Sequence, residues 1–421
     1  MTEARTGPLA VTGLGVVGPA GVGTEAFAKA IREGISHLAP ITRFDPEGFP
    51  VALAGEARDF TPSDLIEGRY LVQTDLFSQF AMATADEALA DAGLEQPGDP
   101  YDVGVLICSY AGGVTFGQVE IERLWARGPR HVGPYQSIAW FYAASTGQVS
   151  IRRGLKGACA VLVTDEPGAL DALGHSAREL RRSGGAMLVG GAEAPVGSPF
   201  SLACQVGAGL LSPDRDPATA YRPFSPRARG YVPGEGGAVL AVETAEAAEA
   251  RGARVRALVL GHATAFGGTA AFDPGGEALE HAARTALDRA GLAPGDVDLV
   301  FADALGTAEA DAAEAAVLAR LLPDVPVTAP KAGFGRAYAG AGALDLAAAV
   351  LALEQGFVPP TPWPDPDEPV LEELAGRLVR GAGPAAAPRT ALVLSRGFGG
   401  ACSAAVLARA GHPLPPLPAA A

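Results

Sequence analysis

Two adjacent carboxylic acids, Asp165 and Glu166, follow the apolar run of residues 161–164 and precede Pro167. The apolar run predicts a strand, and proline is typical of the first position of a helix, so the positive end of that helix would face residue 166. Such a turn suits a nucleophile of lowered pKa, but glutamate is a weak nucleophile toward thioesters. A carboxylate that caps the helix is therefore an equally good interpretation of Glu166.

Two further motifs resemble known sites without meeting their structural requirements. Residues 13–18 spell GxGxxG, the dinucleotide fingerprint, but Pro19 and a further loop separate these glycines from the helix expected to begin near Thr24. The pair His175 and Ser176 resembles half of a nucleophile elbow, but it lies within a helical pattern. We therefore expect a glycine-rich strand at the first motif, no hydrolase triad at the second, and no cofactor.

Metal ligands are not expected either. The acidic set Asp303, Glu309, Asp311 and Glu314 lacks the alternating oxygen ligands and central glycine of a calcium loop, so we interpret Asp311 and Glu314 as a pair at a helix start. The cysteines lie far apart without a CxxC pair, which excludes a zinc ribbon and favours a reducing cytoplasm. They are Cys108, Cys159, Cys204 and Cys402.

The composition indicates a globular protein with a large core. The chain has 421 residues, of which 48% are apolar and 19% charged. Its net charge of −15 would repel nucleic acids and anionic lipid. No apolar run approaches the roughly 20 residues that span a bilayer, so no membrane partner is expected.

The elements that must position these residues alternate between strands and helices, which indicates an α/β fold. Strand patterns cover residues 9–18 and 102–109, and helical patterns cover residues 24–34 and 74–94. A helix ending in AGL, a Pro-Gly-Asp loop and a strand occur at 85–109 and again at 283–304, and the tetrapeptide GALD also occurs twice. We expect a duplicated core with halves 1–250 and 251–410, and a Pro- and Ala-rich tail at 411–421.

Three stretches resemble the signatures of β-ketoacyl synthases of the thiolase fold. They are PRARGYVPGEG at 226–236, SRGFGG at 395–400 and the opening VTGLGVVGPAG. The resemblance extends over residues 8–410. It implies a duplicated βαβαβαββ core in an α-β-α-β-α layered arrangement, which agrees with the internal repeat.

The resemblance also implies that this chain lacks the residues that perform condensation in the family. Family members use a cysteine nucleophile and two histidines, and the three matching positions are Glu166, Asp303 and Arg336. Around them, the retained family positions are Lys331, Asp311, Glu314 and Phe398. Condensation needs a thiolate to hold the acyl chain and imidazoles to stabilise the enolate, so no catalytic residue for condensation is expected here.

One branch of the family shares this profile, the chain length factor, or ketosynthase β subunit, of type II polyketide synthases. Residues 122–129, 134–148 and 168–175 are similar to signatures of that branch, although its members usually carry glutamine where this chain has Glu166. The resemblance implies a heterodimer with an active ketosynthase α subunit, enclosing a tunnel for the growing chain. Acyl carrier proteins are acidic, so the charge of −15 suggests that they dock mainly on the partner.

Four positions match the tunnel end in chain length factors: Val114, Gly117, Ile121 and Ile138. The first three share a helical face, which is also typical of ordinary core packing. Because these side chains are small or aliphatic, we expect unfilled space there and a long product, a decaketide or longer.

Three alternatives remain open at this point. The chain could be a malonyl-carrier-protein decarboxylase that generates starter units, with Glu166 polarising the thioester through water. It could condense through another thiol, Cys108 or Cys159, although a cysteine in the setting of Cys159 is usually buried core. It could also be a homodimeric structural protein without a tunnel.

Overall fold

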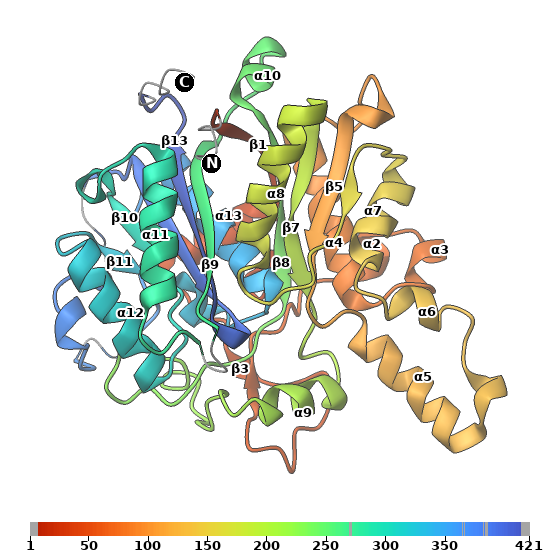
Figure 1. Ribbon diagram of the computed structural model, residues 1–421. Helices are drawn as coiled ribbons and strands as arrows, with labels where there is room; N and C mark the ends of the chain where they lie inside the picture. Colours follow the sequence, from red (N-terminus) through yellow and green to blue (C-terminus); the bar gives the residue numbers. More distant parts are fainter. Residues whose placement is uncertain are drawn as a thin grey trace.

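The computed structural model describes residues 7–268, 272–363, 365, 367–381, 383 and 386–413 (Figure 1). An 11-stranded mixed sheet runs through the molecule in the order β11-β10-β12-β13-β9-β1-β8-β7-β5-β6, with β2 paired to β1. The strands of its first half are β1 (Leu9–Gly18), β2 (Gly21–Val22), β5 (Val103–Cys108), β6 (Cys159–Ala160), β7 (Ala186–Glu193) and β8 (Gly236–Thr244). Those of its second half are β9 (Ala257–Phe266), β10 (Leu299–Phe301), β11 (Val327–Thr328), β12 (Thr390–Arg396) and β13 (Ala401–Arg409).

The two halves of the sheet repeat one pairing pattern about the β1–β9 contact. On each side of that contact two antiparallel pairings are followed by two parallel ones: β1-β8-β7-β5-β6 on one side and β9-β13-β12-β10-β11 on the other. The halves join through three antiparallel residue pairs between β1 and β9. The sheet therefore has the pseudo-twofold symmetry that the sequence repeat predicts.

Helices cover both faces of each half. Helices α4 (Leu76–Ala92) and α7 (Ala144–Arg153) pack on the outer face of the first half, and α11 (Glu277–Ala290) and α12 (Ala308–Leu321) lie beside the second half. Helices α8 (Gly168–Ser183) and α13 (Ala339–Gln355) pack against each other between the halves (Figure 1). This is the predicted arrangement of five layers.

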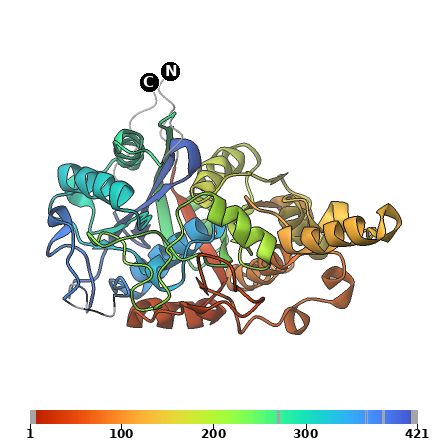
Figure 2. The same ribbon diagram turned by 90° about the horizontal axis from the view of Figure 1, so that it is seen from below.

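The remaining elements lie around this core. They are α1 (Thr24–Glu33), α2 (Pro62–Leu65), α3 (Gly68–Leu71), α5 (Val114–Arg127), α6 (Gln136–Ala139), α9 (Pro199–Gly207), α10 (Ala245–Ala250), β3 (Ala39–Pro40) and β4 (Leu53–Ala54). Short 3₁₀ turns are η1 (Pro100–Asp102), η2 (Pro129–His131), η3 (Pro294–Asp296), η4 (Pro330–Gly333), η5 (Glu372–Leu374) and η6 (Phe398–Gly400). Figure 2 shows that α5 projects away from the body of the molecule.

The duplicated motif has the same structure in both copies. In each, a long helix ends at a glycine in the left-handed conformation, Gly93 after α4 and Gly291 after α11. A 3₁₀ turn follows, and then a strand that pairs in parallel with its neighbour. The left-handed conformation explains the glycine of each AGL, because other L-residues adopt it at a cost.

The glycines of the GxGxxG motif, Gly13, Gly15 and Gly18, lie within β1, and the first two allow a helix to pack closely on the strand. A Cβ atom on Gly13 would lie 2.1 Å from the carbonyl oxygen of Ala88, and one on Gly15 would lie 2.0 Å from that of Thr84, both in α4. Only glycine allows the helix backbone to approach the strand so closely. The prediction of a structural glycine strand is confirmed.

The predicted strand at residues 161–164 is wrong, because β6 ends at Ala160. Val105 N donates to Ala158 O, as a parallel ladder requires, but the next donor of β5, Ile107 N, bonds to the Thr146 hydroxyl at 3.1 Å. That hydroxyl in turn donates to Ala160 O at 3.1 Å. The α7 side chain thus stands between the two strands and ends their pairing.

In the described part of the chain no helix is both long enough and apolar enough to cross a membrane. Most of the expected tail, residues 414–421, lies outside the described residues.

Candidate functional site

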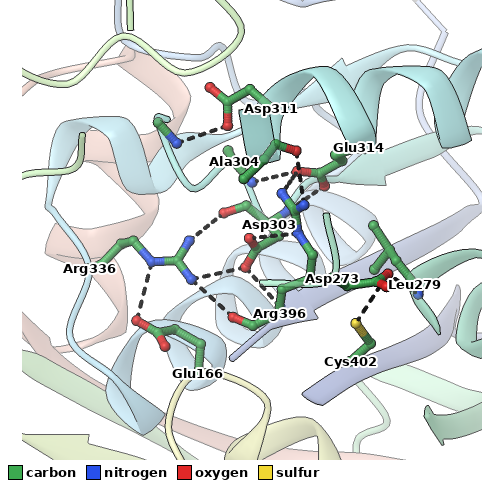
Figure 3. A network of polar contacts seen from close by, with 12 residues as sticks. Glu166, Asp273, Leu279, Asp303, Ala304, Asp311, Glu314, Arg336, Arg396 and Cys402 are labelled. Atoms are coloured by element: carbon green, nitrogen blue, oxygen red, sulfur yellow. Dashed lines mark hydrogen bonds and ion pairs between the residues drawn. The ribbon is translucent and has the colours of Figure 1, made fainter. Parts of the chain in front are cut away.

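Glu166, Asp303 and Arg336 come together in the interior between the two halves (Figure 3). Glu166 precedes α8, Asp303 follows β10, and Arg336 precedes α13. The Arg336 guanidinium donates from Nε to Glu166 Oε1 at 3.2 Å and from Nη2 to Asp303 Oδ1 at 3.0 Å. All three side chains are buried. The positions that the resemblance singled out therefore form one ion-pair network.

A fourth charged residue, Arg396 at the end of β12, completes this network. Its Nε donates to Asp303 Oδ2 at 3.2 Å, its Nη2 to Glu314 Oε2 at 2.9 Å, and its backbone N–H to Asp303 Oδ1 at 2.9 Å. In the sequence, Arg396 stands out only as part of SRGFGG, and that motif indicates no role for it. The sequence does contain a signal for this role. A charged residue that directly continues a buried apolar strand requires a buried partner.

The opposite charges of the network stabilise the ionised forms of these side chains. Burial alone would raise the pKa of Asp303, but the guanidinium groups of Arg336 and Arg396 lower it to about 2. Burial opposes the charge of Arg336 as well, whereas Asp303 and Glu166 raise its pKa well above the usual value. Asp303 and Arg336 are therefore permanently charged at neutral pH. Neither can exchange a proton as the imidazoles of a condensing enzyme do.

Asp311 and Glu314 hold the loop before α12. Asp311 accepts hydrogen bonds from Gly306 N at 2.9 Å and Phe224 N at 2.7 Å, and Glu314 accepts from Asp303 N at 2.8 Å and Ala304 N at 2.9 Å. Asp311 lies in the first turn of α12, as the helix-start interpretation predicted, but Glu314 lies beyond that turn. Both carboxylates bond to backbone outside the helix, and Glu314 also accepts from Arg396.

Lys331 of η4 is buried and forms an ion pair with Asp345 of α13, with Nζ 2.5 Å from Oδ2. Asp345 is the aspartate of the second GALD sequence. Burial raises its pKa to about 6, although the Lys331 charge opposes this shift. The retained lysine thus fixes α13 at the edge of the site.

Phe398 lies in η6, held by Asp165 and by aromatic rings. Its backbone N–H donates to Asp165 Oδ2 at 2.5 Å, and its ring centroid lies 5.0 Å from that of Phe272 and 6.0 Å from that of Tyr110. Asp165 is therefore a structural partner of the 397–400 loop, a role that the sequence pattern did not indicate.

The two thiols considered as alternative nucleophiles are not activated. Cys108 is buried and donates to Gly168 O at 3.2 Å, and burial raises its pKa far above the usual thiol value. Cys159 is exposed, which corrects the expectation of a core residue, and desolvation still raises its pKa. A reactive cysteine requires the opposite shift. Within the described residues no cluster of three or more His, Cys, Asp or Glu side chains could hold a metal ion.

The four expected tunnel positions lie on α5 and α6, two helices at one edge of the molecule (Figure 1). Val114, Gly117 and Ile121 all lie on α5, as the helical spacing predicted. Ile121 is 42% exposed and Ile138 of α6 is 38% exposed, so in this chain alone these two are not core residues. Gly117 is buried. The expectation of unfilled space beside it is wrong, because a Cβ there would lie 2.9 Å from Cδ1 of Trp140.

Eight large apolar side chains on and around α5 and α6 are exposed. They are Val119, Ile121, Leu124, Trp125, Tyr135, Ile138, Trp140 and Phe141. Large exposed apolar surfaces of this kind mark sites of protein–protein contact. We call the set the α5–α6 apolar surface.

Glu193, at the end of β7, is a buried acid beside the network. Its Oε1 accepts a hydrogen bond from Tyr110 N, and Oε2 has no partner in the structure. Burial raises its pKa to about 8, and the neighbouring Glu166 adds to this shift. Between its usual pKa of 4.5 and about 8, the folded chain keeps a proton that the unfolded chain has lost.

We therefore expect Glu193 to make the free energy of unfolding fall as the pH rises through that window. Glu193→Gln should show a smaller fall between about pH 5 and 8, measured by urea unfolding at several pH values. Glu95→Gln, at an exposed position, is the control and should keep the dependence of the original chain. Equal slopes in the original chain and Glu193→Gln would contradict the assignment.

Comparisons with known proteins agree with these observations. Residues 6–248 match the family model for the β-ketoacyl synthase N-terminal domain, and residues 256–363 match that for the C-terminal domain. A putative polyketide β-ketoacyl synthase 2 of Streptomyces halstedii is 51% identical, covering 96% of this chain and 98% of the relative. The tetracenomycin polyketide synthase ketoacyl synthase beta subunit of Streptomyces glaucescens is 47% identical, covering 96% and 99%.

Solved structures show the same fold. A chain of the ishigamide ketosynthase/chain length factor superposes with a TM-score of 0.86 at 28% identity, covering 96% of this chain and 100% of that one. A chain from a type II polyketide synthase acyl-carrier protein complex with its ketosynthase, bound to the hexaketide, gives 0.82 at 28% identity, covering 97% and 100%. The chain belongs to the β-ketoacyl synthase family, within which it is a type II polyketide ketosynthase β subunit, or chain length factor.

Proposed function

We propose that this chain is the non-condensing half of a heterodimeric ketosynthase and that it sets polyketide length through a tunnel at the subunit interface. The observation that carries the proposal is the buried ion-pair network of Glu166, Asp303, Arg336 and Arg396. According to the resemblance, Glu166, Asp303 and Arg336 match the positions at which a condensing family member has its cysteine and two histidines.

The chemistry of condensation is incompatible with this network. A malonyl thioester that loses carbon dioxide leaves an enolate, which needs hydrogen-bond donors at its oxygen. The permanently charged Asp303 carboxylate would repel that anion, and the Arg336 guanidinium is already engaged by two carboxylates. Glu166 offers no thiolate. An active partner must therefore supply the nucleophile and the imidazoles.

The α5–α6 apolar surface is the proposed contact with that partner. Its exposed aliphatic and aromatic side chains would be removed from water on assembly, which stabilises the complex. Val114, Gly117, Ile121 and Ile138 lie within or beside this surface, where a tunnel between the subunits would end.

Carrier-protein docking is proposed on the partner rather than on this chain. One of the related structures contains an acyl-carrier protein in complex with its ketosynthase. The net charge of −15 would slow the approach of an acidic carrier protein. The four thiols of this chain are free, which suits action in the cytoplasm.

A starter-unit decarboxylase fits less well. The Glu166 carboxylate is buried, and its Oε1 already accepts a hydrogen bond from Arg336. It would have to leave that ion pair before it could orient a water molecule toward a thioester.

We expect the purified chain to give no chain extension with malonyl-carrier protein, and extension to begin when a ketosynthase carrying Cys-His-His is added. The measurement is product mass spectrometry, with size-exclusion chromatography to follow the complex. Glu166→Cys should remain inactive alone, because Asp303 and Arg336 still occupy the histidine positions.

Each rival predicts a different result. Extension by the single chain would refute the proposal. Acetyl-carrier protein formed by this chain and lost in Glu166→Ala would favour the decarboxylase. A stable homodimer that does not bind the ketosynthase would favour the structural alternative.

A further inference from the structure

Two glycines just before α5 allow the start of this helix to pack closely on the end of α6 and on the residue after it. A Cβ on Gly113 would lie 1.9 Å from Ala139 O, and one on Gly112 would lie 2.7 Å from Trp140 O. The backbone N–H of Gly113 also donates to Trp140 O at 3.0 Å. These contacts fix the backbone of Trp140 against the start of the helix.

The indole of Trp140 lies over Gly117. The position of a Cβ on Gly117 is 2.9 Å from Cδ1 and 3.6 Å from Nε1 of the ring, so the ring lies too close to residue 117 for a side chain to fit there without displacing it. Half of Trp140 is nevertheless exposed. One side of the indole thus packs on the helix and the rest faces outward, two residues after Ile138 and on the Gly117 side of α5.

We propose that Trp140 is a length-determining residue of this chain. The lack of a side chain at Gly117 lets the indole pack against α5 and so sets how far the ring reaches toward the growing polyketide. This inference rests on the proposed function. Trp140 has the largest side chain at this site, and the small residue beneath it serves to accommodate the ring rather than to leave space for product. The occupant of the remaining space would be the apolar end of the enclosed chain.

The proposal predicts opposite effects at the two positions. Trp140→Ala removes the ring and should lengthen the product, with Trp140→Phe intermediate. Gly117→Ala places a methyl group only 2.9 Å from Cδ1, closer than two carbon atoms pack, so the ring must move outward and the product should shorten. We expect the ratio of longer to shorter products to change by about tenfold in each case.

The decisive measurement is the coupling between the two residues. Gly117→Ala acts through the ring, so it should shift the product length in the original chain but not in Trp140→Ala. Products are measured by mass spectrometry on the purified complex with the ketosynthase partner. Tyr101→Ala removes an exposed aromatic ring on η1, outside the α5–α6 apolar surface, and serves as the control.

A second measurement tests the contact between the Trp140 indole and Gly117 without any partner. In a chain carrying Trp125→Phe and Trp363→Phe, Trp140 is the remaining tryptophan. Adding Gly117→Ala should increase quenching of its fluorescence by acrylamide, because the ring loses its contact with the helix.

The outcomes separate failure of this inference from failure of the proposed function. If Ile121→Phe changes product length while the Trp140 variants change only partner affinity, Trp140 is interface packing and the inference fails alone. If none of these variants changes product length in an intact, active complex, both fail. An equal shift by Gly117→Ala with and without Trp140 would also overturn the inference.

Discussion

Arg336→Met is expected to lower the free energy of unfolding by about 3–5 kcal/mol, because it leaves the Glu166 and Asp303 carboxylates without a shared counter-ion. The loss should be measurable as a lower urea midpoint at an unchanged m-value. Methionine resembles the arginine stem in length and is apolar, so the effect reports mainly the missing charge. Such a loss would show that the buried ion-pair network stabilises the fold.

Two comparisons identify the cause of that loss. Arg254→Met removes an exposed arginine that pairs with Glu354 at 2.5 Å and should cost about 0–1 kcal/mol. The double variant Glu166→Gln with Arg336→Met removes one charge of each sign and should lose less than Arg336→Met alone. A loss in Arg336→Met no larger than that in Arg254→Met would show that the network contributes little to stability.

The fold could be predicted from the sequence because its signals are local or repeated. The apolar runs at 9–18 and 102–109 and the helical periods at 24–34 and 74–94 agree closely with the observed elements. The duplicated AGL motif predicted two equivalent halves, and the sheet has that symmetry. The family could also be predicted, since the glycine-rich motifs and Lys331 keep the resemblance recognisable.

Contacts between distant segments could not be predicted in the same way. Strand β6 stops at Ala160 because a hydroxyl from α7, Thr146, enters the ladder, and no strand propensity encodes that event. The role of Arg396 depends on Asp303 and Glu314, more than 80 residues away along the chain. In the same way, the sequence around Gly117 does not indicate that Trp140, from another segment, covers that glycine.

Ile121 is the position at which added bulk should shorten the product most directly. Its side chain is exposed on α5, one helical turn beyond Gly117, and no described side chain covers it as Trp140 covers Gly117. A phenylalanine there can be accommodated in the isolated chain without repacking its core. In the complex, the added ring would compete for space with the end of the growing polyketide.

Ile121→Phe should therefore shift the main product of the reconstituted complex to a shorter chain than the original complex makes. Forcing extra carbon atoms into a packed wall costs about 1–3 kcal/mol, which corresponds to a change of roughly five- to hundredfold in the ratio of extension to release. Ile151→Phe, at an exposed position on α7, is the matched control and should leave the product unchanged. An unaltered length distribution in a well-folded Ile121→Phe complex would mean that this residue only packs against the partner, because a tunnel wall cannot gain a ring without losing room for the chain.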